Sequence, residues 1–224
     1  MCGRFTQNYT WQEVHEFLSV FGVARNLQPR YNIAPTTNVD VVRLDREGRR
    51  ELVSMRWGLV PFFWKKTLKE VPATFNARAE TLADRPMFRE ALQHRRCIIP
   101  ASGFYEWAGA KGDKQPHLFT AADGSPILAF AGLWDRWRDP VSKEEVLSCT
   151  IIVTKASQWM MPFHDRMPVL LAAKDFDPWL RGTLSPAALG PASEDALREW
   201  PVARRVNKAD IGDDDPATIE RVAA

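Results

Sequence analysis

Cys2 is the second residue of the chain, directly after the initiator methionine. A small side chain in this position lets aminopeptidases remove the methionine, so Cys2 would then carry an α-amine and a thiol on adjacent carbons. An α-amine has a reference pKa of roughly 7.7–8.0, so part of it is neutral at physiological pH. A neutral amine attacks an aldehyde to give a Schiff base, and the thiol can close on the imine carbon to form a thiazolidine. Taken alone, a cysteine at position 2 is more simply explained by chance than by function.

Three other polar residues could move protons or orient a reacting group. His164 could shuttle protons near neutral pH, although a structural histidine bonded to the following aspartate is the simpler interpretation. Glu106 lies between two aromatic residues on an expected strand and faces away from both of them. Such a carboxyl can have a raised pKa and act as an acid or base, or it can be an exposed strand residue. Asn76 could orient a reacting group, but asparagine more often forms turns.

Several other kinds of chemistry find no support in the sequence. It contains no G-x-G-x-x-G or Walker loop and no G-x-S-x-G elbow. Cys97 and Cys149 are not in C-x-x-C pairs and the four histidines are scattered, so we expect no metal and no cofactor. Three cysteines, an odd number, predict no disulfide framework and fit a reducing cytosol. No apolar run reaches the roughly 18–20 residues of a membrane helix, and no signal-peptide pattern is present.

Composition and charge predict an ordinary globular domain with an uneven charge distribution. The 224 residues are 45% hydrophobic and 26% charged, which disfavours wholesale disorder. The net charge of +2 combines 16 Lys/Arg and 11 Asp/Glu in residues 1–110 with 14 and 17 in residues 111–224. From Asp210 onward there are five acidic residues and one arginine, so the preceding body carries +6. A basic body with nine tryptophans is compatible with nucleic-acid binding, and also with a solvated surface over a bulky core.

The expected elements are mostly short strands. A capping box at Thr10 and Glu13 begins an amphipathic helix that carries apolar residues at Val14, Phe17, Leu18 and Phe21. Gly48 and Asp123-Gly124 mark expected turns, the latter a hairpin. Strands are expected at 39–44, 51–56, 96–99, 103–107, 117–120, 127–133, 146–154 and 202–206, and short helices at 87–92, 175–180 and 194–200. Because strands follow one another with few long helices, we expect a single α+β domain, built on a mostly antiparallel or mixed sheet or a barrel-like core with short flanking helices.

Eight segments in this order resemble one known family, the SOS response-associated peptidase (SRAP) family of abasic-site-processing proteins. They are MCGRF (1–5), YNIAPT (31–36), RWGLVP (56–61), NARAET (76–81), RCIIPASGFYEW (96–107), FAGLW (130–134), HDRMP (164–168) and RVN (205–207). One such segment would be weak support, whereas eight in order over about residues 2–207 are specific. The resemblance implies the SRAP fold for residues 2–209, with Met1 removed and residues 210–224 as an acidic, solvated tail.

The resemblance also implies a reaction and the residues that perform it. The N-terminal cysteine of this family captures the ring-opened aldehyde of an abasic site in single-stranded DNA as a thiazolidine crosslink. Carried over by motif, Cys2 is the nucleophile through both amine and thiol, and Asn76 holds Cys2 and the sugar. Glu106 assists proton transfer, and His164 helps to open the deoxyribose ring. A weak lyase side reaction by β-elimination is implied as well. The "peptidase" label reflects removal of residues before the cysteine, by the protein itself or by an aminopeptidase.

The same resemblance gives candidate DNA contacts. They are Arg4, Arg78, Arg85, Arg166 and Thr154 for phosphates, Phe63 and Trp64 for stacking on bases, and Pro35 in the same groove. Each residue could instead serve core packing or surface charge. A proline after Arg85 departs from the family pattern and puts that contact in doubt, and the chain lacks the second asparagine that commonly follows Asn207.

The expected partner is therefore single-stranded DNA that contains abasic sites, together with proteins of the replication fork. We expect a monomer with no membrane partner, located in the cytoplasm on nucleoid DNA. Two alternatives remain open at this point. One is a non-covalent module that binds single-stranded DNA, and the other is an N-terminal-nucleophile thiol peptidase.

Overall fold

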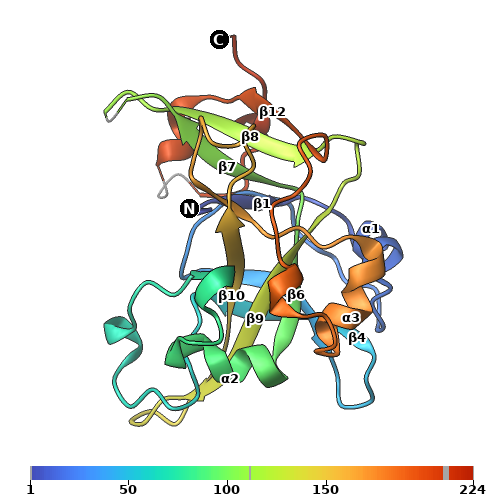
Figure 1. Ribbon diagram of the computed structural model, residues 1–224, viewed down its shortest axis with the longest axis vertical. Coiled ribbons are helices and arrows are strands. Elements are labelled where there is room, and N and C mark those ends of the chain that lie inside the picture. Colours follow the sequence, from blue (N-terminus) through green and yellow to red (C-terminus); the bar gives the residue numbers. More distant parts are fainter. Residues whose placement is uncertain (1, 111, 209–211, 224) are drawn as a thin grey trace.

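The computed structural model describes residues 2–110, 112–208 and 212–223. Its strands form two sheets, one toward each end of the molecule in Figure 1. The strand β1 (Phe5–Gln7) belongs to the smaller sheet and lies near the middle of the molecule. The smaller sheet has the order β12-β8-β7-β1-β2, and all its printed pairings are antiparallel. Its other strands are β2 (Arg30–Ile33), β7 (Gly103–Ala108), β8 (Gln115–Ala121) and β12 (Leu197–Pro201).

The larger sheet closes on itself as a five-stranded barrel. Its order is β11-β10-β4-β3-β6-β9, and β9 pairs back with β10, so β10, β4, β3, β6 and β9 form a ring. Most pairings are antiparallel, but β10 runs parallel to β4 and to the short β5. The bounds are β3 (Asn38–Leu44), β4 (Arg50–Trp57), β5 (Asn76–Arg78), β6 (Arg96–Ala101), β9 (Leu128–Arg138), β10 (Glu145–Lys155) and β11 (Arg166–Pro168). Closure leaves the barrel strands without free edges.

Within the part of the chain that the structure describes, three short helices flank the strands, namely α1 (Trp11–Leu18), α2 (Pro86–His94) and α3 (Phe176–Leu180). Each has a local reason to form where it does. The Thr10 and Glu13 side chains cap α1 reciprocally, and Pro86 occupies the first turn of α2, where no amide hydrogen is needed. Helix α1 ends because Ser19 takes a left-handed conformation with φ 51°, so Phe21 lies outside the helix and is exposed. The expected α+β domain with a barrel-like mixed core is confirmed.

The core separates into two main clusters. One fills the space between the barrel and the smaller sheet and includes Cys2, Phe5, Trp57, Phe104 and Phe130. The other packs the helices against the outside of the barrel strands. Phe5 meets Trp57 edge to face with ring centroids 4.9 Å apart, a favourable geometry for aromatic pairs. The aromatic residues thus fix the N-terminal segment between the two sheets.

Three expectations for local structure were wrong. Residues 194–200 do not form a helix, because Leu197–Pro201 is the edge strand β12 that pairs with β8. Residues 202–206 do not form a strand, since Val202 makes only an isolated bridge and a 3₁₀ helix covers Arg204–Asn207. Asp123-Gly124 does form a turn, but β8 and β9 on either side of it belong to different sheets, so it closes no hairpin.

The described part of the acidic C-terminal segment, residues 212–223, packs against the smaller sheet. Asp213 pairs with Arg30 and its carbonyl accepts the amide of Tyr31, while the Trp200 indole donates to the Ile219 carbonyl at 2.9 Å. Asp215 pairs with Arg205. The expected solvated tail is therefore wrong for this part, since its acidic side chains find arginines on the body. The expected boundary at residues 209 and 210, and the expected removal of Met1, lie outside the described residues.

Candidate active site and nucleic-acid interface

Cys2 lies fully buried just before β1, in the core cluster that joins barrel strands to the smaller sheet. Its Sγ approaches the Arg4 carbonyl at 3.9 Å. Burial raises the pKa of the Cys2 thiol well above its ordinary value, and the nearby Glu106 charge raises it further. The thiol is therefore protonated at neutral pH, unlike the low-pKa thiolates of cysteine nucleophiles. This environment suits a thiol that reacts second, after an amine.

Asn76 is held against Cys2 by the short strand β5. Because β5 pairs in parallel with β10, with Asn76 opposite Ile151, the asparagine lies at the edge of the barrel. Its Nδ2 donates to the Cys2 carbonyl at 2.7 Å. Its Oδ1 is buried and accepts no hydrogen bond from the residues that the structure describes. A buried amide oxygen with spare capacity beside Cys2 can orient an amine or a hydroxyl.

Glu106 comes to the same place from the smaller sheet. Along β7, Phe104 and Glu106 face the Cys2 cluster, and Tyr105 between them packs on the opposite face with Val202. Glu106 is 2% exposed, and burial raises its pKa to about 7, with the charge of Asp165 also raising it. A carboxyl with this pKa can both accept and donate a proton at physiological pH. Of the two sequence interpretations, the buried carboxyl is confirmed.

His164 lies in the connection between β10 and β11. Burial lowers its pKa, and Lys114 and Arg166 lower it further, while Asp165 raises it. The Arg166 amide donates to His164 Nδ1 at 2.9 Å, which places the proton of a neutral ring on Nε2. Asp165 Oδ1 is also 2.8 Å from Nδ1, a contact that would require protonation there. The lowered pKa favours the neutral ring, with Nε2–H available as a donor.

The fold thus gathers Cys2, Asn76 and Glu106, with His164 in the same electrostatic environment. Asn76 contacts Cys2 directly, and the Glu106 charge acts on the Cys2 thiol. Asp165 and Lys114 shift the pKa values of both Glu106 and His164. Residues that are far apart in the sequence therefore share one site from β1, β5, β7 and the β10–β11 connection.

Some of the arginines predicted to contact phosphates are exposed, whereas others already form hydrogen bonds within the protein. Arg78 is exposed on β5 and, by alternation, on the same side of that strand as Asn76. Arg85 is exposed at the start of α2. Arg166 donates to Glu80 at 2.6 Å, and Arg4 donates through Nη1 to Asn32 and to the Val206 carbonyl. Both of these arginines are therefore already engaged inside the fold.

The remaining predicted contacts lie in three settings. Thr154 is buried on β10, and Pro35 is partly exposed just before Thr36, which has a left-handed φ of 73°. Phe63 is exposed and Trp64 is partly buried, both in the segment that follows β4. Neighbouring Phe62, which sequence reasoning missed, is more exposed than Phe63. The signal available in the sequence was the run of three aromatic residues after Pro61.

A second missed residue is His117, which stands opposite Glu106 in the pairing of β7 with β8. Its Nδ1 lies 2.6 Å from Glu199 Oε2, and its ring meets Phe163 edge to face. His117 therefore lies beside Glu106 and also beside the segment that carries His164. Only the register of the sheet reveals this position.

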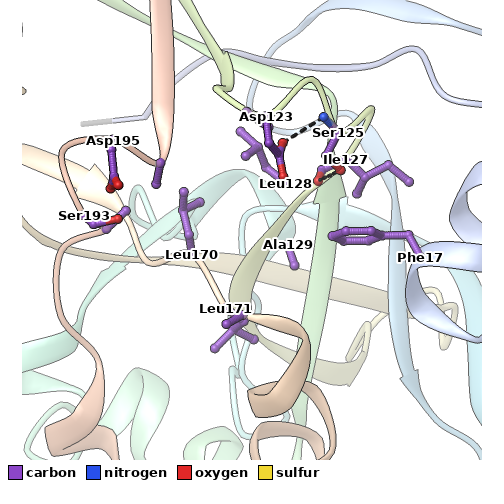
Figure 2. A pocket seen from close by; sticks show the side chains of 14 residues that line it. Phe17, Asp123, Ser125, Ile127, Leu128, Ala129, Leu170, Leu171, Ser193 and Asp195 are labelled. Carbon is purple, nitrogen blue, oxygen red and sulfur yellow. Dashed lines mark hydrogen bonds between the residues drawn. The ribbon is translucent and has the colours of Figure 1, made fainter.

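A pocket lies elsewhere in the molecule. It measures about 540 Å³ and is formed by residues that include Phe17 of α1, the turn around Asp123, Leu170, Leu171 and the segment with Ser193 and Asp195 (Figure 2). None of the predicted site residues lines it. Within the described residues, no group of three His, Cys, Asp or Glu side chains is placed to hold a metal ion, and no helix is long and apolar enough to cross a membrane.

The structure resembles solved structures over most of its length. One from Bacteroides thetaiotaomicron superposes with a TM-score of 0.88 at 23% identity, covering 99% of this chain and 100% of that one. Another, from Bordetella bronchiseptica, has a TM-score of 0.79 at 28% identity and covers 90% and 100%. The first likeness concerns the fold alone.

The sequence itself is similar to several proteins named abasic site processing proteins. It is 36% identical over 217 residues to YoqW of Bacillus subtilis (strain 168), covering 92% of this chain and 94% of that protein. It is 33% identical over 220 residues to YedK of Escherichia coli (strain K12), with the same coverage of 92% and 94%. HMCES of Xenopus tropicalis is 31% identical over 67% of this chain and 52% of its own. Residues 1–209 match the pattern described as SOS response associated peptidase (SRAP). The chain belongs to the SOS response associated peptidase family.

Proposed function

We propose that this protein recognises abasic sites in single-stranded DNA and traps them as a thiazolidine crosslink through the amine and thiol of Cys2. Relatives over nearly the whole chain are named abasic site processing proteins. The observation that carries the proposal is the meeting of Asn76 and buried Glu106 at Cys2, where a carboxyl with a pKa of about 7 faces the first residue of the mature chain. Such a carboxyl is the acid and base that imine chemistry needs.

In the first step the neutral amine attacks the aldehyde carbon of the open sugar, forming a C–N bond. One amine proton passes by way of ionised Glu106 to the aldehyde oxygen, which becomes a hydroxyl. The second amine proton then passes by way of Glu106 to that hydroxyl, which leaves as water and gives the neutral Schiff base. Asn76 holds the backbone of Cys2 and offers its Oδ1 to the amine or the sugar.

In the second step the thiol closes on the imine carbon. A C–S bond forms, the imine π electrons move to nitrogen, and the thiol proton ends on that nitrogen by way of Glu106. The high pKa of the Cys2 thiol fits this order, because a neutral thiol carries the proton that the ring nitrogen needs. The same property disfavours a thiol peptidase, whose nucleophile is a thiolate.

His164 has a separate role at the sugar. A closed deoxyribose must open before its aldehyde is available, which requires a proton on the ring oxygen and removal of one from the C1′ hydroxyl. A neutral imidazole can donate a hydrogen bond from Nε2–H to the ring oxygen as the C1′–O bond breaks, while water takes the C1′ hydroxyl proton and supplies the proton that the ring oxygen gains. The lowered pKa of His164 keeps the ring neutral at physiological pH.

Two further activities belong to this proposal. From the Schiff base, removal of a C2′ proton would cleave the strand by β-elimination, a weak lyase reaction with which thiol closure competes. Before any of this, Met1 must leave so that the Cys2 amine is free. Self-processing and an aminopeptidase both meet that requirement, and the intact mass of protein made in a strain without methionine aminopeptidase separates them.

The DNA interface that we propose combines Arg78, beside Asn76 on β5, with the exposed aromatic residues after β4. We also infer that the protein acts as a monomer on nucleoid DNA and meets proteins of the replication fork. Size-exclusion chromatography with light scattering, and crosslinking in replicating cells, test these inferences.

The decisive experiment mixes mature protein with an oligonucleotide that contains one abasic site and follows adducts that survive denaturation. Wild type should form the adduct, and Cys2→Ala should lose it because the thiol that closes the ring is gone and the Schiff base that the remaining amine can form hydrolyses on denaturation. Cys149→Ala and Cys97→Ala, which remove equally buried thiols, should keep it. An undiminished adduct in Cys2→Ala would refute the mechanism. Binding without any adduct would favour the non-covalent module, and cleavage of peptides would favour the peptidase.

A further inference from the structure

The segment after β4 exposes aromatic side chains to solvent. Phe62 is 52% exposed and Phe63 is 41% exposed, and their rings meet edge to face with centroids 5.4 Å apart. Gly58, with φ +131°, begins the segment in a conformation that side chains rarely adopt, and its amide donates to the Cys149 carbonyl. Exposed apolar rings next to one another indicate a contact surface, since water disfavours them.

Buried groups of the barrel hold the backbone of this segment from below. The three hydrogen bonds run from the Val60 amide to Ser148 Oγ at 2.8 Å, from the Phe62 amide to Asp135 Oδ2 at 3.0 Å, and from the Trp137 indole to the Trp64 carbonyl at 2.7 Å. The partners belong to the neighbouring strands β9 and β10 and are buried. The segment is therefore fixed at three points to the buried side chains of two barrel strands.

Asp135 is the charged member of this set. It is 3% exposed and lies with Oδ1 3.1 Å from Arg95 Nε, while the Arg95 guanidinium sits over the Phe62 ring, 5.6 Å from its centroid. The Asp135–Arg95 pair thus holds Phe62 twice, by its amide and by its ring. Glu90 also contacts Arg95, at 3.1 Å. The contacts of Arg95 Nε and Nη2 are ion pairs without hydrogen-bond geometry, whereas the Phe62 and Arg136 amides donate hydrogen bonds to the Asp135 carboxylate.

We propose that Asp135 is a positioning residue, which keeps Phe62 and Phe63 as a preformed platform on which unpaired bases beside the lesion stack. This inference rests on the proposed function, and it adds Asp135, Arg95 and Phe62 to the residues that serve it. Stacking on aromatic rings accepts any base, which suits a protein that must bind a lesion in any sequence. A rigid platform avoids the ordering of side chains that weakens binding.

The test measures two quantities for Asp135→Asn, the affinity for intact single-stranded DNA and the rate of thiazolidine formation with a small aldehyde such as glycolaldehyde. The amide is close in size to the carboxyl but no longer pairs with Arg95. We expect affinity to fall roughly 5- to 10-fold, within the range of one lost base stack, and the small-aldehyde rate to stay unchanged. Asp139→Asn is the matched control, because Asp139 also accepts backbone amides near the end of β9 but touches no residue of the platform.

A double-mutant cycle separates positioning from general damage to the fold. Phe62→Ala, an exposed substitution, should lower affinity by a similar factor, and Asp135→Asn in that background should add little. Full additivity, or an unchanged affinity in folded Asp135→Asn, would overturn the proposal. An equal loss of the small-aldehyde rate would also overturn it, by showing that the whole site is disturbed. If wild type failed to react with the small aldehyde, the proposed function would fail while the affinity cycle still tested the platform. If Phe62→Ala bound DNA as tightly as wild type, the base-stacking platform would be refuted, and a protein partner for these rings would be favoured instead.

Discussion

The site around Cys2 and the aromatic segment after β4 rest on the same barrel but differ in almost every physical respect. At Cys2 the polar groups are buried and their pKa values are shifted, whereas at Phe62 and Phe63 the apolar groups are exposed and the polar groups lie beneath them. We propose that the first arrangement controls protons and that the second presents rings to DNA. Chemistry and recognition can therefore be disturbed independently of each other.

Glu106→Gln is expected to have the largest effect, because it should slow the reaction at Cys2 without weakening DNA binding by the aromatic segment. Glutamine keeps the shape but cannot exchange a proton, so crosslinking to an abasic oligonucleotide should slow by roughly 10²- to 10⁴-fold. Affinity for intact single-stranded DNA should stay within about twofold. Single-turnover rates at saturating protein, beside direct binding measurements, check this. A large loss of affinity for DNA would show that Glu106 is a binding residue and would contradict the proposed separation of proton chemistry from DNA binding.

The same substitution should stabilise the protein at high pH. Burial holds the pKa of Glu106 at about 7 in the folded state, above its ordinary 4.5. Between these two pH values Glu106 is protonated in the folded state but ionised in the unfolded state. The free energy of unfolding therefore falls as pH rises from 4.5 to about 7. Glu106→Gln should therefore gain about 1–3 kcal/mol over wild type at pH 8, and much less at pH 4.5.

Urea denaturation of both proteins at the two pH values measures this difference. Glu144→Gln, which changes an exposed glutamate, should show no such pH-dependent gain. A constant offset between wild type and Glu106→Gln at both pH values would show that burial of the charge is not its source.

The smallest effect is expected from Phe63→Ala. Loss of one exposed ring should weaken binding of single-stranded DNA by roughly 5- to 10-fold, and should leave both stability and the small-aldehyde reaction nearly unchanged. Val141→Ala, which shortens an exposed apolar side chain away from the platform, is a suitable control. Fluorescence anisotropy of a labelled oligonucleotide measures the affinity. Slower reaction with the small aldehyde would contradict the separation of the two regions.

Most of the regular structure could be predicted because its signals are local. The capping box of α1 and the alternating apolar residues of β3, β4 and β9 act within a few positions of each other. The C-terminal part resisted prediction for the opposite reason. Residues 197–201 form an edge strand only because β8 offers a partner, and the acidic residues after 212 dock only because arginines of the body face them.

The sequence by itself determined the family, and it predicted the reacting residue and the candidate partners of that residue, because the motifs and the position of Cys2 are linear features. Only the tertiary structure decided which of these groups are buried together. Proton chemistry depends on desolvation and on charges at a few ångströms, and those distances come from β1, β5 and β7 meeting between two sheets. The same holds for Asp135, a buried carboxylate whose contact with Phe62 spans 73 positions in the sequence and exists only in the folded barrel.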